Sequence, residues 1–233
     1  MIVSHRHRYI FLRTRKTAGT SVEIALSKFC GPDDVITSDV DDGLRRELGY
    51  PGPQNDADIP VRRYGVSDWK NLLLHRQRAT YRNHATAARV RRLVGEAVWS
   101  SYFKFTIERD PWDKTVSLYY WRLRGQEPKP TLPEFVRQSS ARALSNARIY
   151  FIGGRPAVDR VLRYEKLDEE LEQVRLQLAL PEPLVLPHAK STQRTERAHY
   201  SALLGPEERR IIERACRREI TLLGYRFDDR GAG

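Results

Sequence analysis

The chain has few of the residues that hold small or metal-dependent proteins together. It contains two cysteines, Cys30 and Cys216, which lie far apart and follow no metal-ligand pattern. Its six histidines do not combine with them into a zinc spacing, so no metal is expected. No run is long and apolar enough to span a bilayer, and the N-terminal residues lack the apolar stretch of a signal peptide. These absences predict a cytoplasmic protein with reduced cysteines and no membrane partner.

The composition favours one globular domain with an excess of positive charge. With 233 residues, 40% of them hydrophobic, the chain can bury a sizeable core in a single domain spanning 1–233. The 41 Lys and Arg against 30 Asp and Glu give a formal charge of +11. The basic segment 76–92, which contains Tyr81, comes closest to a nucleic-acid-binding stripe. No helix-turn-helix, zinc-finger or RNA-recognition signature accompanies it, so no nucleic-acid partner is expected.

The segment 9–23 has the pattern of an anion-binding loop. Tyr9 to Leu12 reads as a buried strand, and it runs through a basic turn of small residues directly into a helix. Ala18 and Gly19 would let the backbone approach a ligand, and the first N–H groups of the helix would point at it. The ATP-binding loop G-x-x-x-x-G-K-[ST] is disfavoured, because here Lys16 precedes the glycine. The alternative is that the small residues serve only close packing.

A second strand-to-helix segment, 102–121, carries an arginine at its boundary. Asp110 is a good N-cap and Pro111 a good first helical residue, so Arg109 is expected at the strand's carboxyl end. Ser117 follows two turns into the helix. An arginine and a serine that converge suit a terminal phosphate. The alternative is an Arg109 that is paired with Glu108 or Asp113.

Together the two motifs resemble those of sulfotransferases that use 3'-phosphoadenosine 5'-phosphosulfate (PAPS), closest to the branch of carbohydrate sulfotransferases and their bacterial relatives. Lys-Thr-Ala-Gly-Thr-Ser at 16–21 is similar to the 5'-phosphosulfate loop, and Arg109 with Ser117 to the 3'-phosphate site. Segments 161–167 and 223–227 extend the resemblance weakly. The chain departs from the family at Arg13 and Arg15, where a His and a Pro are frequent, and at Asp110, where Asn is common. The two extra cations are expected to favour an anionic donor.

The resemblance implies a fold, a substrate and a set of site residues. The fold is a three-layer α/β domain of the P-loop nucleotide-kinase-like type, with a central parallel sheet and helices on both faces. The donor is PAPS and the product is adenosine 3',5'-bisphosphate (PAP), with no metal. The implied donor-binding residues are Arg15, Lys16, Thr17, Ala18, Gly19, Thr20, Ser21, Arg109, Ser117, Tyr164, Lys190 and Ser191, with Arg194 as a further candidate.

Sulfuryl transfer also needs a base for the acceptor hydroxyl. His84, in a His-x-Thr-Ala-Ala pattern before a predicted helix, is the first candidate and His75 the second. Lys16 is expected to meet the charge that develops on the leaving phosphate. The resemblance favours a sugar hydroxyl, on a glycan or a glycosylated small molecule, as the acceptor, with a phenol or a peptide tyrosine as alternatives. The alternatives are a kinase-like nucleotide phosphotransferase or a basic nucleic-acid-binding module.

The remaining pattern predicts further elements around these motifs. The segment 31–65 reads as an irregular excursion, rich in Asp, Pro and Gly, that could form part of the acceptor cleft. Four aromatic residues of the Pro111 helix are assigned to the core: Trp112, Tyr119, Tyr120 and Trp121. Helices are expected at 86–94, 111–124, 132–138, 168–180 and 206–223, and a strand at 158–164.

Overall fold

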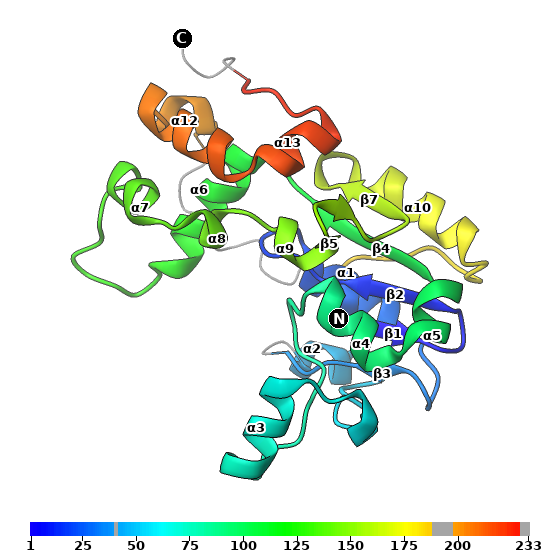
Figure 1. Ribbon diagram of the computed structural model, residues 1–233. Coiled ribbons are helices and arrows are strands. Elements are labelled where there is room, and N and C mark those ends of the chain that lie inside the picture. Colours follow the sequence, from blue (N-terminus) through cyan, green and yellow to red (C-terminus); the bar gives the residue numbers. More distant parts are fainter. Residues whose placement is uncertain (40–41, 188–197, 229–233) are drawn as a thin grey trace. The chain divides into compact units, whose positions relative to one another are not determined.

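The computed structural model describes residues 1–39, 42–187 and 198–228 (Figure 1). The chain groups into two compact units. The first comprises 1–107 and 149–189, and the second comprises 108–148 and 190–233. The single functional domain over 1–233 therefore stays a prediction.

The first unit is an α/β structure built on a five-stranded sheet in the order β3-β1-β2-β4-β7. Its strands are β1 (Ile2–Ser4), β2 (Tyr9–Leu12), β3 (Val35–Ile36), β4 (Phe103–Glu108) and β7 (Arg160–Arg163). β2 and β4 are parallel, as expected, with Phe11 opposite Phe105. β1 is antiparallel to both β2 and β3, so the sheet is mixed, whereas a parallel sheet was expected. The reason is local: β1 and β2 are joined by a four-residue turn, too short for a parallel crossover.

Helices cover both faces of this sheet, as expected. On β2, Tyr9 and Phe11 point into a cluster with α1 (Gly19–Ser27) and α10 (Leu167–Gln177). The alternate residues, Ile10 and Leu12, point into a second cluster with α4 (Ala87–Val94) and α5 (Glu96–Ser101). This alternation follows from the two-residue period of a strand, and all four residues are fully buried.

The first unit also holds the short elements around the sheet. These are α2 (Asp42–Glu47), η1 (Val61–Arg63), α3 (Val66–His75), α9 (Ala147–Tyr150), β5 (Phe151–Ile152), β6 (Arg155–Pro156) and η2 (Tyr164–Lys166). The segment 31–65 is less irregular than expected, because it supplies the edge strand β3 and helix α2. Its part in acceptor binding stays a prediction.

The second unit is helical around a core of its own. It contains α6 (Pro111–Arg122), α7 (Leu132–Gln138), α8 (Ala141–Leu144), α11 (Tyr200–Leu203), α12 (Pro206–Ala215) and α13 (Arg217–Leu223). The expected single helix 206–223 is two helices, because the backbone of Cys216 leaves the helical region at φ −105° and ψ 21°. Trp112 is 1% exposed, as expected, whereas Trp121 is 39% exposed and does not belong to the core. Nine residues separate the two, which places them on opposite faces of α6.

Within the described ranges, no helix is both long and apolar enough to cross a bilayer. Cys30 and Cys216 are buried thiols. Burial raises the pKa of the Cys30 thiol to about 12, so it stays protonated and unreactive at neutral pH.

Candidate anion-binding site

The loop between β2 and α1 reaches the helix through a strained backbone. Lys16 and Ala18 both have positive φ angles, 61° and 58°, in the left-handed region that residues with a Cβ seldom adopt. Ala18 is the N-cap of α1, and no side chain caps the helix there. The first turn of α1 also contains no acidic residue. A nine-residue helix thus presents its N-terminal N–H groups and the positive end of its dipole without a capping side chain, which is the arrangement that binds anions.

Two threonine hydroxyls fix this loop against the sheet. The Thr14 hydroxyl donates to the carbonyl oxygen of Ile107 in β4 and lies 2.8 Å from the Thr17 hydroxyl. Both side chains are buried, Thr17 completely. The Thr17 hydroxyl therefore has a structural partner, and only its backbone N–H is left for the donor-binding role assigned from the sequence.

Gly19 is required by the protein's own packing. A Cβ built on Gly19 would lie 2.8 Å from Cγ of Arg13 and 3.4 Å from the Thr14 carbonyl oxygen. The close approach that this glycine permits is thus to the Arg13 side chain. For this position the packing alternative raised by the sequence accounts for the residue.

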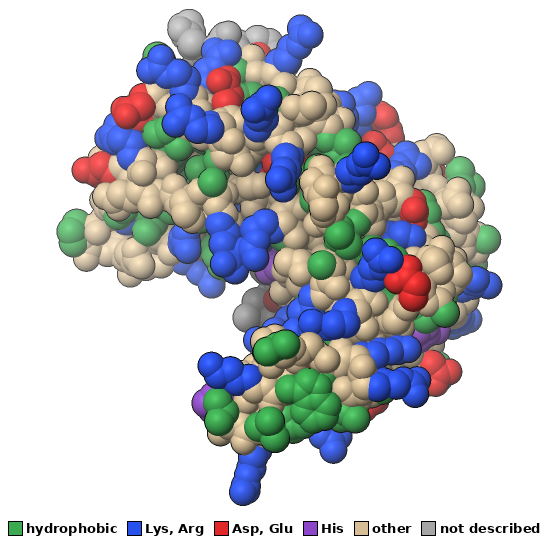
Figure 2. Space-filling view, viewed as in Figure 1, with side chains coloured by type: hydrophobic (Ala, Val, Ile, Leu, Met, Phe, Trp, Pro, Cys, Tyr) green, Lys and Arg blue, Asp and Glu red, His purple; other side chains and the backbone are tan. Residues whose placement is uncertain are grey.

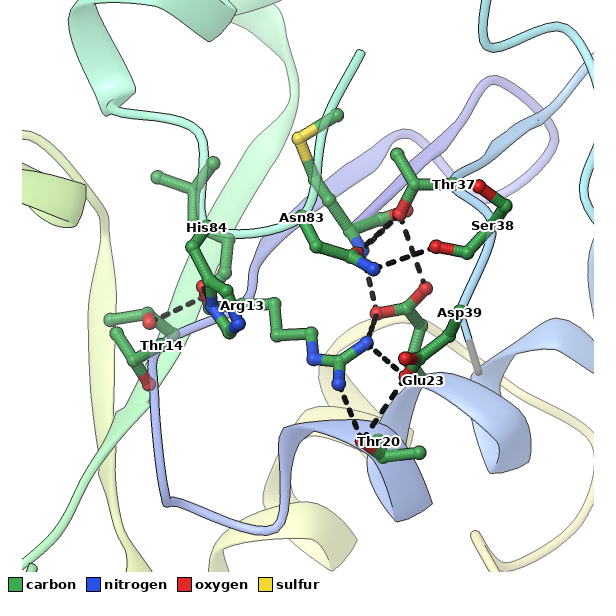
Figure 3. Close-up of polar contacts among 12 residues, drawn as sticks. Arg13, Thr14, Thr20, Glu23, Thr37, Ser38, Asp39, Asn83 and His84 are labelled. Carbon is green, nitrogen blue, oxygen red and sulfur yellow. Dashed lines mark hydrogen bonds and ion pairs between the residues drawn. The ribbon is translucent and has the colours of Figure 1, made fainter. Parts of the chain in front are cut away.

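Arg13 points into a buried charge network (Figure 3). Its NH1 lies 3.2 Å from Glu23 and 2.5 Å from Asp39, and its NH2 lies 2.5 Å from the Thr20 hydroxyl. The side chain is 8% exposed. Two carboxylates therefore pair with Arg13, and its expected effect on an anionic donor stays a prediction. Thr20 is buried as well, and its hydroxyl is shared between Arg13 and Asp39.

Glu23 is the centre of this network. It is completely buried on α1, and its second oxygen accepts from Arg45 of α2 at 2.9 Å. The Met1 ammonium lies 2.6 Å from Glu23 and also donates to Thr37 and Asn83. Burial by itself would raise the pKa of Glu23, but the ammonium, Arg13 and Arg45 outweigh it and hold the pKa below its usual value. The network connects α1 and α2 with the segments around Thr37 and Asn83, next to the loop between β2 and α1.

His84 is attached to the same loop through the backbone. Its Nδ1 lies 3.0 Å from the carbonyl oxygen of Arg13 (Figure 3). A carbonyl only accepts, so Nδ1 carries the proton and Nε2 keeps its lone pair. Burial first, and then the positive charge of Arg13, lower the pKa of His84 to about 4, with a smaller effect from Arg15. At neutral pH His84 is thus a neutral imidazole in one tautomer, with Nε2 as an acceptor. The second candidate base, His75, is the exposed last residue of α3.

The other exposed or half-exposed members of the loop are candidates for ligand contact. Arg15, Lys16, Ala18 and Ser21 are partly exposed around the start of α1. Lys16 and Ser21 lie on either side of the start of α1, and their part in donor binding stays a prediction.

In the second unit, Arg109 is held by an acidic neighbour. Its Nε and NH2 both approach one oxygen of Asp113, at 2.7 and 2.5 Å. Asp110 caps α6, as expected, by accepting from the N–H groups of Trp112 and Asp113. Asp113 and Ser117 are one turn apart on α6 and share a face, so Arg109 is drawn to the face that carries the partly exposed Ser117. The structure contains the Arg109–Asp113 pair that the sequence left as an alternative.

The remaining predicted site residues lie in the first unit or outside the described residues. Tyr164 begins η2, is half-buried and packs against the cluster that contains Leu162 and Leu167. Lys190, Ser191 and Arg194 lie outside the described residues. Across the described ranges, no group of three His, Cys, Asp or Glu side chains could hold a metal ion. Sequence reasoning missed Glu23, because its partners Thr37 and Arg45 lie far from it in the chain.

Comparison with known proteins adds one relative. The chain is 30% identical over 99 residues to an uncharacterized protein of Archaeoglobus fulgidus, a match that covers 41% of this chain and 82% of that protein. The chain belongs to the same family as that archaeal protein. No protein-family model matches the chain. No solved structure matches it either.

Proposed function

We propose that this protein is a PAPS-dependent O-sulfotransferase that acts in the cytoplasm, with a P-loop nucleotide-kinase-like fold. The observation that carries the proposal is the start of α1, where a strained basic loop leads into an uncapped helix N-terminus with no acidic residue in its first turn. The resemblance of residues 16–21 to a 5'-phosphosulfate loop indicates which anion this turn would bind.

In this proposal the N–H groups of the first turn and the Ser21 hydroxyl bind the 5'-phosphate of the donor. Lys16 interacts with the oxygen that bridges sulfur and phosphorus, where negative charge grows as the S–O bond breaks. Arg109 and Ser117 bind the 3'-phosphate, which distinguishes PAPS from ATP. The 3'-phosphate carries more negative charge than the Asp113 carboxylate. Arg109 therefore either leaves Asp113 for the phosphate or contacts both.

His84 accepts the proton of the acceptor hydroxyl at Nε2. The acceptor oxygen forms a bond to sulfur, the bond between sulfur and the 5'-phosphate oxygen breaks, and PAP leaves. In the unliganded protein, nearby positive charge contributes to the low pKa of His84. A bound polyanionic donor would offset that charge and raise the pKa toward neutrality, so the base would become effective when the donor is present. We propose a sugar hydroxyl, on a glycan or a glycosylated metabolite, as the acceptor.

The proposal is tested by incubating the protein with PAPS and a panel of glycosides, phenols and tyrosine peptides, and by following sulfated product and PAP. His84→Gln and Lys16→Ala should each lower the rate by on the order of a hundredfold. Lys28→Ala is the matched control, because it removes the same charge at the other end of α1 and should leave the rate unchanged. Transfer that persists in both site variants would contradict the assignment, as would transfer of a phosphoryl group from ATP.

A further inference from the structure

Helix α3 exposes large apolar side chains on the first unit. Val66 is 90% exposed, Leu73 76%, Leu74 63% and Trp69 42%, and Val61 of the adjoining η1 is 54% exposed. Figure 2 shows hydrophobic side chains gathered over α3, with Lys and Arg side chains around them. We name these five residues, together with Arg62, Lys70, Arg76 and Arg78, the α3 surface.

The geometry of the helix explains why these side chains are exposed together. At about 100° per residue, Val66, Trp69 and Leu73 fall on one side of α3, with Lys70 and Leu74 beside them. Asp68 and Leu72 fall on the opposite side. Asp68 is 3% exposed and is paired with Arg89 and Arg92 of α4, and Leu72 packs on the core cluster. α3 is therefore anchored by one side, while its apolar side is uncovered in the described part of the chain.

The α3 surface carries charge of one sign. Residues 61–82 contain six Lys and Arg and one acidic residue, a net charge of +5 (6 − 1). The one acidic residue is Asp68, which is buried between Arg89 and Arg92. Arg62, Lys70, Arg76 and Arg78 are all exposed. Any occupant of the α3 surface must therefore combine an apolar layer with negative charge.

We propose that the α3 surface docks the protein on an anionic membrane, with α3 lying in the plane of the interface. Trp69 and the aliphatic side chains would enter the boundary between headgroups and acyl chains, and the Lys and Arg side chains would reach the lipid phosphates. The ten residues of α3 are too few to cross a bilayer, so the helix lies on it. This departs from the expectation of no membrane partner, and it does not rest on the proposed function.

Two other occupants fit the α3 surface less well. A second copy of the chain would bring two rims of positive charge together, which repel each other. A single-stranded nucleic acid stacks successive bases on several aromatic rings, and Trp69 is the one aromatic member of the α3 surface, beside four aliphatic side chains.

The test is cosedimentation of the full chain with vesicles of phosphatidylcholine alone and of phosphatidylcholine mixed with phosphatidylserine. We expect binding only to the anionic vesicles, and weaker binding at high salt. Leu73→Ser and the double variant Lys70→Glu/Arg76→Glu should each weaken binding by on the order of tenfold. The side chain of Leu73 is 76% exposed, so its replacement leaves the core intact and an unchanged thermal midpoint confirms the fold.

Matched control variants distinguish binding through the α3 surface from nonspecific binding to vesicles. Leu176→Ser removes an exposed leucine from α10, and Arg217→Glu reverses an exposed charge in the second unit. Neither should change vesicle binding. The proposal is overturned by no binding to anionic vesicles, or by equal losses in the α3 and control variants. It is also overturned by a self-association or an RNA affinity that depends on Leu73 in the absence of vesicle binding.

Discussion

The two strand-to-helix junctions of this protein, β2–α1 and β4–α6, differ in whether side chains cap the first backbone N–H groups of the helix. At β4–α6, Asp110 accepts from two backbone N–H groups, Pro111 removes another donor, and Asp113 adds negative charge in the first turn. At β2–α1 the cap is Ala18 in a left-handed conformation, with neither a capping side chain nor an acidic first turn. The α6 junction has caps of its own, whereas the first turn of α1 has no capping side chain, and we propose that an anion binds there.

At β2–α1 the stabilising groups are buried side chains beside the loop, and they do not cap the first turn of α1. Arg13, Glu23, Asp39 and Arg45 form buried contacts that hold the loop in a strained conformation. Strain of this kind persists only where the surroundings enforce it, and it is concentrated at binding sites. The network thus accounts for how the junction keeps its N–H groups uncapped.

We expect the largest loss of stability from the removal of Arg13. Arg13→Met leaves Glu23 and Asp39 with fewer cations in a buried setting, and we expect a loss of about 3–5 kcal/mol in the free energy of unfolding. Urea denaturation measures it. Lys28→Met removes an exposed ion pair with Glu182 at the end of the same helix and should change the free energy of unfolding far less. Similar losses in the two variants would contradict the structural role of the network.

The next largest effect is expected in the pH dependence of stability, because the buried His84 ring is hydrogen-bonded to the carbonyl oxygen of Arg13. Its pKa is about 4 in the folded protein, against an ordinary value of 6.5 for a histidine, so the unfolded chain binds the proton more readily between these values. The stabilisation is present above about pH 6.5 and is lost as the pH falls through about 4, at most about 3 kcal/mol.

Urea denaturation from neutral pH down to about pH 4 checks this, with His84→Gln as the comparison. The variant should have a shallower pH dependence than the parent protein. Identical slopes would show that His84 titrates normally and is not buried against the loop.

The smallest effect is expected at the α6 junction. Asp110→Ala removes the acceptor of two backbone N–H groups and should destabilise the protein by about 1 kcal/mol. Asp110→Asn keeps a capping oxygen and should change the free energy of unfolding by less than about 0.5 kcal/mol. Thermal unfolding of the two variants distinguishes them. Equal stability of the Ala and Asn variants would show that the cap contributes nothing.

The two junctions also differ in how much of them the sequence predicts. Local signals placed β2 and the boundaries of α4 and α6, because Thr86, Gly95, Asp110 and Pro111 act on their immediate neighbours. The same local signals could not indicate that Arg13 turns inward, since its partners Glu23 and Asp39 come together only in the folded chain. The inward Arg13 depends on such distant contacts, whereas the antiparallel β1 follows from the short turn before β2.

The direct test of the central claim, that the start of α1 binds an anion, is calorimetric titration with PAP beside ATP with magnesium. We expect the protein to bind PAP and not ATP. Ala18→Asp, which gives α1 an acidic cap like that of α6, should weaken PAP binding at least about tenfold. PAP binding that is unaffected by Ala18→Asp, preference for ATP, or no heat from either ligand would contradict the claim.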